Sequence, residues 1–183
     1  MRDLSMHVLD IVQNSIKAEA SLISVAFDLD ENGVLTFTVK DDGRGMSPEF
    51  LKKVTDPFTT TRTTRKVGLG IPMLQQSAEM TGGKLSLTSQ LGKGTVISAT
   101  LHLHSIDCIP MGDICDSLLT LILLNPDRPE FVYRAQSPDQ SASFDTREVR
   151  AALGGVPLNE PDVINWIKES ITEEFKPILE VFS

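Results

Sequence analysis

The hydrophobic residues of the first hundred positions alternate between helix spacing and strand spacing. Residues 4–20 carry an apolar stripe with one-turn spacing, at Leu4, Val8, Ile11, Val12 and Ile16. Residues 22–29 and 34–40 instead alternate apolar with polar positions, which is typical of half-buried strands. The tripeptide Glu31-Asn32-Gly33 between them favours a hairpin turn. The pattern therefore predicts a helix followed by a β-hairpin.

Two more helices and a second hairpin follow in the same part of the chain. A proline at position 48 begins a short predicted helix over residues 48–54, and helical spacing returns over residues 68–81. Residues 84–89 and 95–103 alternate as strands on either side of a glycine-containing turn. We therefore expect four strands and three helices before residue 104.

The pattern changes beyond His104, and residues 105–183 form a candidate second domain, small and of α+β type, separate from a domain over residues 1–104. Its predicted elements are helices over 112–124, 145–153 and 159–176 and strands over 130–136 and 141–144. Pro177 is expected to end the last helix. The apolar stripe of that helix fits core packing, or alternatively a partner interface. No family is recognised in this segment, and its role stays open.

Composition and charge exclude several classes of function. The chain has 17 basic and 25 acidic residues, a formal net charge of −8, so neither nucleic acid nor a membrane surface is an expected partner. Two cysteines and three histidines suggest neither a zinc site nor a disulfide framework, and reduced thiols are typical of the cytoplasm. No apolar run approaches 18 residues. We expect a cytoplasmic protein without a membrane span.

The heptad Lys-Asp-Asp-Gly-Arg-Gly-Met, residues 40–46, ends the second predicted strand. It delivers Asp41 to a turn in which Gly43 and Gly45 let the backbone approach a ligand closely. An ionised aspartate only accepts hydrogen bonds, so a buried one needs a donor such as the exocyclic amine of adenine. The alternative is an ordinary Asp/Gly turn.

A second candidate group lies on the first helix, where Asp10, Asn14 and Lys17 share one face. The Asn14 carbonyl is a hard oxygen ligand suited to Mg²⁺, Lys17 a charge for phosphate, and Asp10 a candidate base. A solvated polar face is the alternative interpretation.

The third candidate is the segment before the helix at 68–81. Residues 59–66 are rich in threonine and basic residues, including Thr60, Arg62 and Lys66, which suits a lid over phosphates or, equally, a plain exposed loop. Gly68-Leu69-Gly70 then opens the helix, whose N-terminal amides can bind an anion.

Taken in order, these segments resemble the GHKL ATP-binding superfamily over residues 1 to about 104. Asn14 matches the asparagine of the N box, with Lys17 where histidine kinases place a phosphate-contacting lysine. Asp41, Gly43 and Gly45 match the first glycine box. The remaining matches are the F box at residues 56–60 with Phe58 and Thr60, the second glycine box at Gly68, Leu69 and Gly70, and the closing Gly-x-Gly-Thr at residues 92–95 with Thr95. Phe58 onward is closest to histidine kinases, whereas residues 10–21 are more similar to the MutL ATPases.

The resemblance implies a two-layer α+β sandwich of the Bergerat type, with a mixed, mostly antiparallel sheet covered on one face by helices. It implies that adenine bonds to Asp41 and is bordered by Gly45 and Met46, and that Mg²⁺ is bound through Asn14. The triphosphate would meet the amides near Gly68 and Gly70 under the lid. Two departures are Asp10 in place of the usual glutamate and Lys66 in place of a usual glycine.

No helical hairpin with a phosphoacceptor histidine precedes the N box helix, so we expect the acceptor on a protein partner. The leading hypothesis is a Mg²⁺-dependent protein kinase, or a kinase-like regulator, that phosphorylates its partner in trans with Asp10 as base. The alternative is an ATP-switched binding module with slow ATPase activity and no kinase activity. A clamp-type ATPase that forms a homodimer on ATP is a third possibility.

Overall fold

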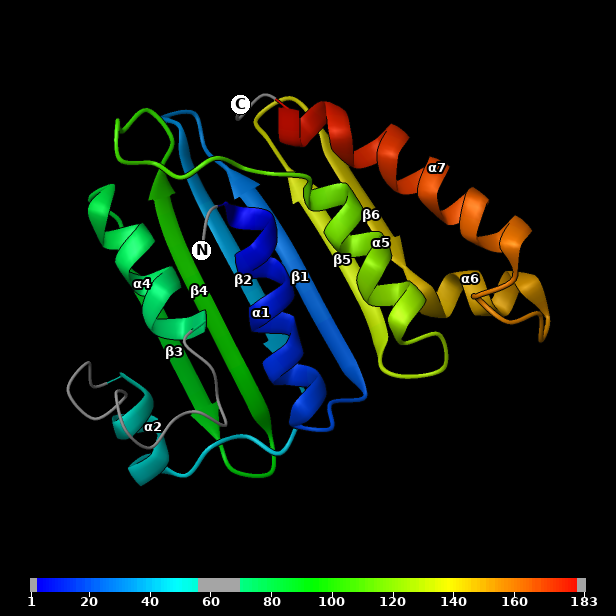
Figure 1. The fold of residues 1–183 in the computed structure, drawn as a ribbon, viewed down its shortest axis with the longest axis horizontal. Coiled ribbons are helices and arrows are strands. Elements are labelled where there is room, and N and C mark those ends of the chain that lie inside the picture. Colours follow the sequence, from blue (N-terminus) through cyan, green and yellow to red (C-terminus); the bar gives the residue numbers. More distant parts are fainter. Residues whose placement is uncertain (1–2, 56–69, 181–183) are drawn as a thin grey trace.

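Six strands form one mixed sheet in the order β3-β4-β2-β1-β5-β6 (Figure 1). The computed structural model describes residues 3–55 and 70–180. The strands are β1 (Leu22–Leu29), β2 (Val34–Asp41), β3 (Leu85–Gln90), β4 (Gly94–His102), β5 (Glu130–Gln136) and β6 (Ser141–Asp145). Neighbouring strands are antiparallel, apart from the parallel pair of β1 and β5.

Helices cover one face of this sheet. They are α1 (Leu4–Lys17), α2 (Pro48–Thr55), α4 (Gly70–Met80), α5 (Ile114–Leu124), α6 (Thr146–Leu153) and α7 (Pro161–Leu179). In Figure 1, α4, α1, α5 and α7 lie side by side in front of the strands, and α1 contacts both α4 and α5. The mixed sheet under a helical layer confirms the predicted α+β sandwich. Among the described residues, no helix is both long and apolar enough to cross a membrane.

Strand alternation decides which side of the sheet the helices cover. Ile23, Val25 and Phe27 of β1 are fully buried, whereas the residues between them are only half-buried. Phe27 lies opposite Phe37 of β2 in the antiparallel register, and their rings stack with centroids 5.4 Å apart. The face with these side chains is the hydrophobic one, so burying it under α1 and its neighbours removes the apolar surface from water.

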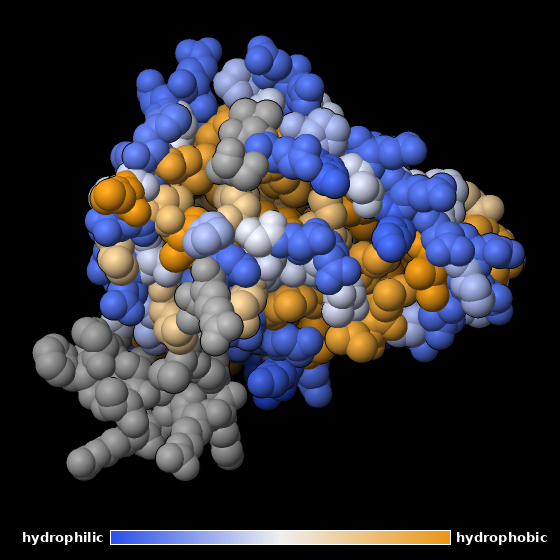
Figure 2. All heavy atoms as spheres, turned by 45° about the horizontal axis from the view of Figure 1, so that its top comes forward, coloured by the Kyte–Doolittle hydropathy of each residue, from blue (hydrophilic) through white to orange (hydrophobic). Residues whose placement is uncertain are grey.

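The outer surface is mostly polar but not entirely so. Figure 2 shows hydrophilic residues over much of one face, with smaller areas of hydrophobic residues between them. Among the described residues, the large apolar side chains that are more than half exposed are Met80, Leu91, Ile106, Leu124 and Trp166. Most large apolar side chains of the strands and helices therefore lie in the core.

A distinct domain over residues 105–183 is not shown, because this segment extends the same sheet. Strand β5 pairs with β1 from Leu22 to Asp28. On β5, Phe131 and Tyr133 are fully buried and continue the alternation of buried and less buried side chains. Helix α5 packs beside α1, where Ser117 Oγ donates to the carbonyl of Ser5 at 3.1 Å. Without β5, β1 would be an edge strand with unpaired backbone groups. The sequence did not reveal this parallel pairing, because its two strands lie about a hundred residues apart.

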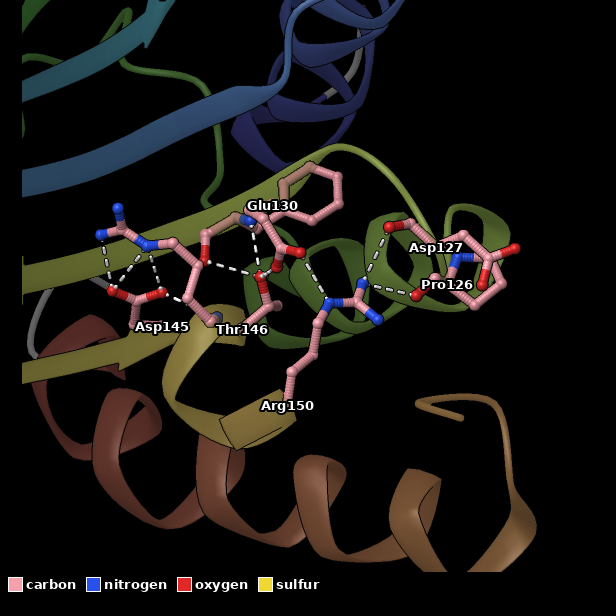
Figure 3. A network of polar contacts seen from close by, with 8 residues as sticks. Pro126, Asp127, Glu130, Asp145, Thr146 and Arg150 are labelled. Carbon is pink, nitrogen blue, oxygen red and sulfur yellow. Dashed lines mark hydrogen bonds and ion pairs between the residues drawn. The ribbon is translucent and has the colours of Figure 1, made fainter. Parts of the chain in front are cut away.

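A polar network joins α6 to the start of β5 (Figure 3). Arg150 Nε donates to Glu130 Oε1 at 2.6 Å, and Nη2 of the same guanidinium donates to the carbonyl of Pro126 at 2.6 Å. Thr146 Oγ1 donates to the other Glu130 oxygen at 2.5 Å and accepts from the backbone N–H of Phe131. The network fixes the loop before β5 to the helix that follows β6.

The prediction that Pro177 ends the last helix is wrong. Helix α7 continues through Pro177 to Leu179. A proline inside a helix removes one backbone donor, but so near the end it affects only the last turns. Ile178 and Leu179 are buried, so continuing the helix places both side chains in the core.

Candidate functional site

A cavity of about 280 Å³ opens between the C-terminal half of α1, the turn after β2 and the start of β4. Its lining residues are Asn14, Ser15, Lys17, Ala18, Asp41, Arg44, Gly45, Met46, Phe50, Ile71, Thr95 and Ile97. Segments far apart in sequence therefore meet here because the central strands β2 and β4 are neighbours and α1 lies across them.

Asp41 lies in the wall of this cavity and is only 8% exposed. Ser15 Oγ donates to its Oδ2 at 2.5 Å, and the backbone N–H of Gly43 donates to its Oδ1 at 2.9 Å. These two bonds fix the carboxyl group while each oxygen keeps a further lone pair. A ligand with a hydrogen-bond donor, such as an amino group, fits this position.

The two glycines of the turn allow close packing on both of its sides. A Cβ on Gly43 would lie 2.8 Å from the carbonyl oxygen of Ala18, at the end of α1. Gly45 has a φ of +71°, and a Cβ there would lie 2.1 Å from the carbonyl oxygen of Gln90, the last residue of β3. Because a side chain at either position would collide with backbone, the turn can reach both neighbours only with glycine.

Met46 and Thr95 are joined through one serine. The backbone N–H of Met46 donates to Ser89 Oγ at 2.8 Å, and Ser89 Oγ lies 2.8 Å from Thr95 Oγ1. The apolar wall of Met46 and the hydroxyl of Thr95 are thereby held on adjacent sides of the cavity.

Asn14 and Lys17 provide polar groups from α1. The Nδ2 atom of Asn14 is buried and has no hydrogen-bond partner among the described residues. Lys17 lines the cavity and forms no ion pair with the described part of the chain. A buried amide N–H group without a protein partner is available to an acceptor on a ligand.

Asp10 lies one turn before Asn14 on the helix and does not line the cavity. A Cβ on Gly70, the first residue of α4, would lie 3.2 Å from Asp10 Cβ, so the start of α4 passes close to this residue. Burial raises the pKa of the Asp10 carboxyl above its ordinary value. A carboxylate with a raised pKa is a better proton acceptor, which suits the predicted base.

The two neighbouring carboxylates of the heptad have different surroundings. Asp42 accepts from the backbone N–H of Ser21 at 2.7 Å, from its hydroxyl at 2.6 Å and from the N–H of Leu22 at 3.0 Å. Burial alone would raise the pKa of Asp42, but these hydrogen bonds hold it below its ordinary value. Asp42 therefore fixes the start of β1, and only Asp41 is available to a ligand.

The structure brings together part of the predicted site. Six predicted residues line the cavity: Asn14, Lys17, Asp41, Gly45, Met46 and Thr95. Gly43, Asp10 and Gly70 lie next to it in the contacts described above. The other predicted residues, Phe58, Thr60, Arg62, Lys66, Gly68 and Leu69, lie outside the described residues.

Sequence reasoning missed several lining residues. Ser15 and Arg44 stand directly beside predicted residues, so their adjacency to Asn14 and Gly45 was a usable signal. The apolar residues Phe50, Ile71 and Ile97 carried no such signal, because apolar wall positions have the same pattern as core positions.

The donors present fit Mg²⁺ only in combination with an anionic ligand. Among the described residues, no three histidine, cysteine or acidic side chains lie close enough to hold a metal ion. Mg²⁺ commonly keeps several waters and is bound through one or two protein oxygens plus substrate phosphates. Asn14 lines the cavity, and its side-chain carbonyl is an oxygen of the kind that Mg²⁺ prefers.

Comparisons with known proteins agree with this geometry. Residues 2–105 match the family described as histidine kinase-, DNA gyrase B-, and HSP90-like ATPase. The chain is 31% identical over 109 residues to histidine protein kinase DivJ of Caulobacter vibrioides, covering 55% of this chain and 18% of that protein. It is 30% identical over 99 residues to sporulation kinase C of Bacillus subtilis, covering 53% of this chain and 23% of the kinase. The matched region thus spans less than a quarter of either relative.

A solved structure extends the fold comparison beyond the matched region. The N-terminal domain of a DNA repair protein superposes with a TM-score of 0.53 at 17% identity, covering 79% of this chain and 52% of that one. At this identity the superposition concerns the fold alone.

Proposed function

The chain belongs to the family of histidine kinase-, DNA gyrase B- and HSP90-like ATPases, and from this premise we propose that it binds ATP with Mg²⁺ in the cavity beside α1 and acts as a protein kinase or kinase-like regulator on a partner in trans. The region that matches the family, residues 2–105, includes every residue that lines this cavity. Family membership by itself supports a histidine kinase-like ATP-binding domain.

One observation carries the assignment of ATP to this cavity. Asp41 lies in the wall of the cavity, where Ser15 and Gly43 hold its carboxyl group, and Lys17 adds a cation to the same cavity. A carboxylate suits the amino group of adenine, and cations suit phosphates. In this proposal Gly45 and Met46 border the base, and Thr95 lies beside Asp41 across the β2–β4 pair.

The proposed phosphate end uses α1 and residues outside the described ranges. Asn14 would supply an oxygen to Mg²⁺, which neutralises phosphate charge when bound, and Lys17 would contact a phosphate oxygen. Asp10 would accept the proton of the attacking hydroxyl or water, which its raised pKa favours. Phe58, Thr60, Arg62, Lys66, Gly68, Leu69 and Gly70 complete the proposed site.

A second candidate function is an ATP-switched binding module without kinase activity. It is favoured by Asp10, whose side chain is one methylene shorter than the usual glutamate, because proton abstraction depends on the distance to the reacting group. In this case the partner receives a conformational signal instead of a phosphoryl group. A clamp-type ATPase that forms a homodimer on ATP is a third, separate candidate.

Binding and transfer are tested in two steps. Titration calorimetry of the full chain with ATP, with and without Mg²⁺, should register heat that depends on the metal. No heat at millimolar ATP and Mg²⁺ would contradict the proposal. The protein is then incubated with ATP labelled at the γ-phosphate and with candidate partner proteins.

The label separates the two functions. Label on a partner protein supports the kinase, and its loss in Asp10→Asn, with binding retained, supports Asp10 as the base. Released phosphate alone indicates an ATPase, and binding without transfer or release indicates the switch. Turnover that persists in Asp10→Asn would assign the base to another group.

A further inference from the structure

Arg44 stands between the two glycines of the turn after β2, and its polar groups contact three other positions. Its backbone N–H donates to the carbonyl of Ala18 at 2.9 Å. Its guanidinium Nη2 donates to the carbonyl of Lys17 at 2.7 Å. Its own carbonyl accepts from the backbone N–H of Gly92 at 2.6 Å. The residue therefore joins the end of α1, the Asp41 turn and the β3–β4 turn.

The end of α1 depends on Arg44 for its last two carbonyls. The carbonyl oxygens of residues 14–16 accept bonds from the backbone N–H groups of residues 18–20. The next two carbonyls, of Lys17 and Ala18, accept instead from the side chain and the backbone of Arg44. A guanidinium at this position also interacts favourably with the negative end of the helix dipole.

We propose that Arg44 is a positioning residue that sets the distance between the base end and the phosphate–metal end of the cavity. The last turn of α1 carries Asn14 and Lys17, and the turn that contains Arg44 begins next to Asp41. A bond between the two turns fixes these ligand groups relative to one another. The inference rests on the proposed function, because it requires that the cavity binds a nucleotide.

The side chain and the backbone of Arg44 can be separated by mutation. Substitution removes the bond to Lys17, whereas both backbone bonds of residue 44 remain. The Asp41 carboxyl keeps its bonds to Ser15 and Gly43 in any such variant. Loss of the side chain should therefore leave the base end intact and free only the carbonyl of Lys17, at the end of α1 that carries the proposed phosphate contact.

The test compares ligands that use one end of the cavity or both. Titration calorimetry of the full chain measures adenosine, which lacks phosphate, and ADP with and without Mg²⁺. In Arg44→Met, we expect affinity for adenosine to stay within about threefold of wild type. Affinity for Mg²⁺–ADP should fall about tenfold, because binding must then order the end of α1 that the Arg44–Lys17 bond holds in wild type. The gain in ADP affinity on adding Mg²⁺ should shrink in the same variant.

Two further variants complete the design. Arg134 lies exposed on β5 and does not line the cavity, so Arg134→Met controls for the loss of one positive charge and should match wild type with every ligand. Arg44→Lys keeps a cation that can donate to the Lys17 carbonyl, and it should restore part of the Mg²⁺–ADP affinity. If Arg44→Met does not fold, as judged by its thermal transition, Arg44→Lys must show the same split between ligands in smaller measure.

The possible failures are distinguishable. If wild type binds none of the ligands, the proposed function fails. If wild type binds but the Arg44 variants lose adenosine and Mg²⁺–ADP affinity equally, Arg44 only supports the fold of the turn and the inference is overturned. Unchanged affinity for all ligands in Arg44→Met overturns it as well.

Discussion

At the residue scale, the two adjacent carboxylates Asp41 and Asp42 have different roles because their side chains point to opposite sides of one strand end. Asp41 meets Ser15 of α1, whereas Asp42 meets the backbone of Ser21 and Leu22. The pleat of a strand alternates side chains between its faces. One carboxylate is thereby available to a ligand while its neighbour is used in the fold.

Asp41→Asn should weaken ATP binding by about 1.5 to 3 kcal/mol, the range for a hydrogen bond to a charged group. The amide presents one acceptor where the carboxylate presents two, so a base amine loses its best partner. Calorimetry with Mg²⁺–ATP measures the change. Asp42→Asn is the matched control: it should lower the free energy of unfolding by about 1 kcal/mol through its bonds to β1 while leaving ATP affinity close to wild type.

His7 makes stability depend on pH. The ring is fully buried on α1, its Nε2 lies 3.3 Å from Ser77 Oγ, and burial lowers its pKa to about 4 from 6.5. Because the unfolded chain then takes up a proton at higher pH than the folded one, the stabilisation is complete above pH 6.5 and is lost as the pH falls towards 4. We expect a loss of about 3 kcal/mol over this window from His7.

Urea unfolding at a series of pH values tests this dependence. In His7→Gln the difference from wild type should shrink as the pH falls from 7 to 4, since the variant has no such group to protonate. His102 is exposed, so His102→Gln should keep the wild-type pH dependence. A His7→Gln profile parallel to wild type would assign the acid sensitivity to other groups.

At the element scale, the sequence predicted the interior of each described helix and strand but not always its end. The bounds of the first two strands were predicted to within one residue. Both the apolar alternation and the turn sequence Glu31-Asn32-Gly33 are local signals, and they agree. Helix α1 ends at Lys17 and not at residue 20, because Glu19 has a left-handed φ of +59°, which the apolar spacing does not reveal. Helix α7 passes Pro177 because burial of its last residues outweighs one lost donor.

The end of α1 contains a local strain that can be removed. Glu19, just after the helix, has a φ of +59°, a conformation that disfavours residues with a Cβ. Glu19→Gly should therefore raise the free energy of unfolding by about 0.5 to 1 kcal/mol. Glu31 has no positive φ and is exposed in the β1–β2 turn, so Glu31→Gly should lower stability. Equal effects of the two changes in urea unfolding would refute the argument from φ.

The junction of α6 and β5 depends on one arginine. Arg150 is bonded to Glu130 and to the carbonyl of Pro126, and its side chain is 29% exposed. Arg150→Met should cost about 2 kcal/mol of unfolding free energy, because it leaves the Glu130 carboxylate without its cation. Arg147 pairs with Asp145 but is 55% exposed, so Arg147→Met should cost clearly less than Arg150→Met. Thermal unfolding of the pair of variants measures the contrast.

At the scale of the whole molecule, ordered motifs predicted the helix-covered sheet and six of the residues around the cavity, Asp41 and Asn14 among them. They could not predict that β5 lies beside β1, because no residue of either strand encodes the identity of a parallel partner reached through a long connection. The same reason applies to Ser117, whose bond to Ser5 joins α5 to α1. Local patterns therefore describe the site better than they describe the extent of the sheet.

Because one sheet runs through both parts of the chain, we expect residues 1–104 to depend on the rest. A chain that ends at residue 104 would expose the edge of β1 along its pairing with β5, and would remove the backbone bonds from Leu4 and Ser5 to residues 110 and 111. Calorimetry of the full chain should give one transition with equal calorimetric and van't Hoff enthalpies. The shortened chain should unfold at a lower temperature or aggregate through its open edge. Two separate transitions in the full chain, the later one matching the shortened chain, would instead identify residues 1–104 as an independent domain.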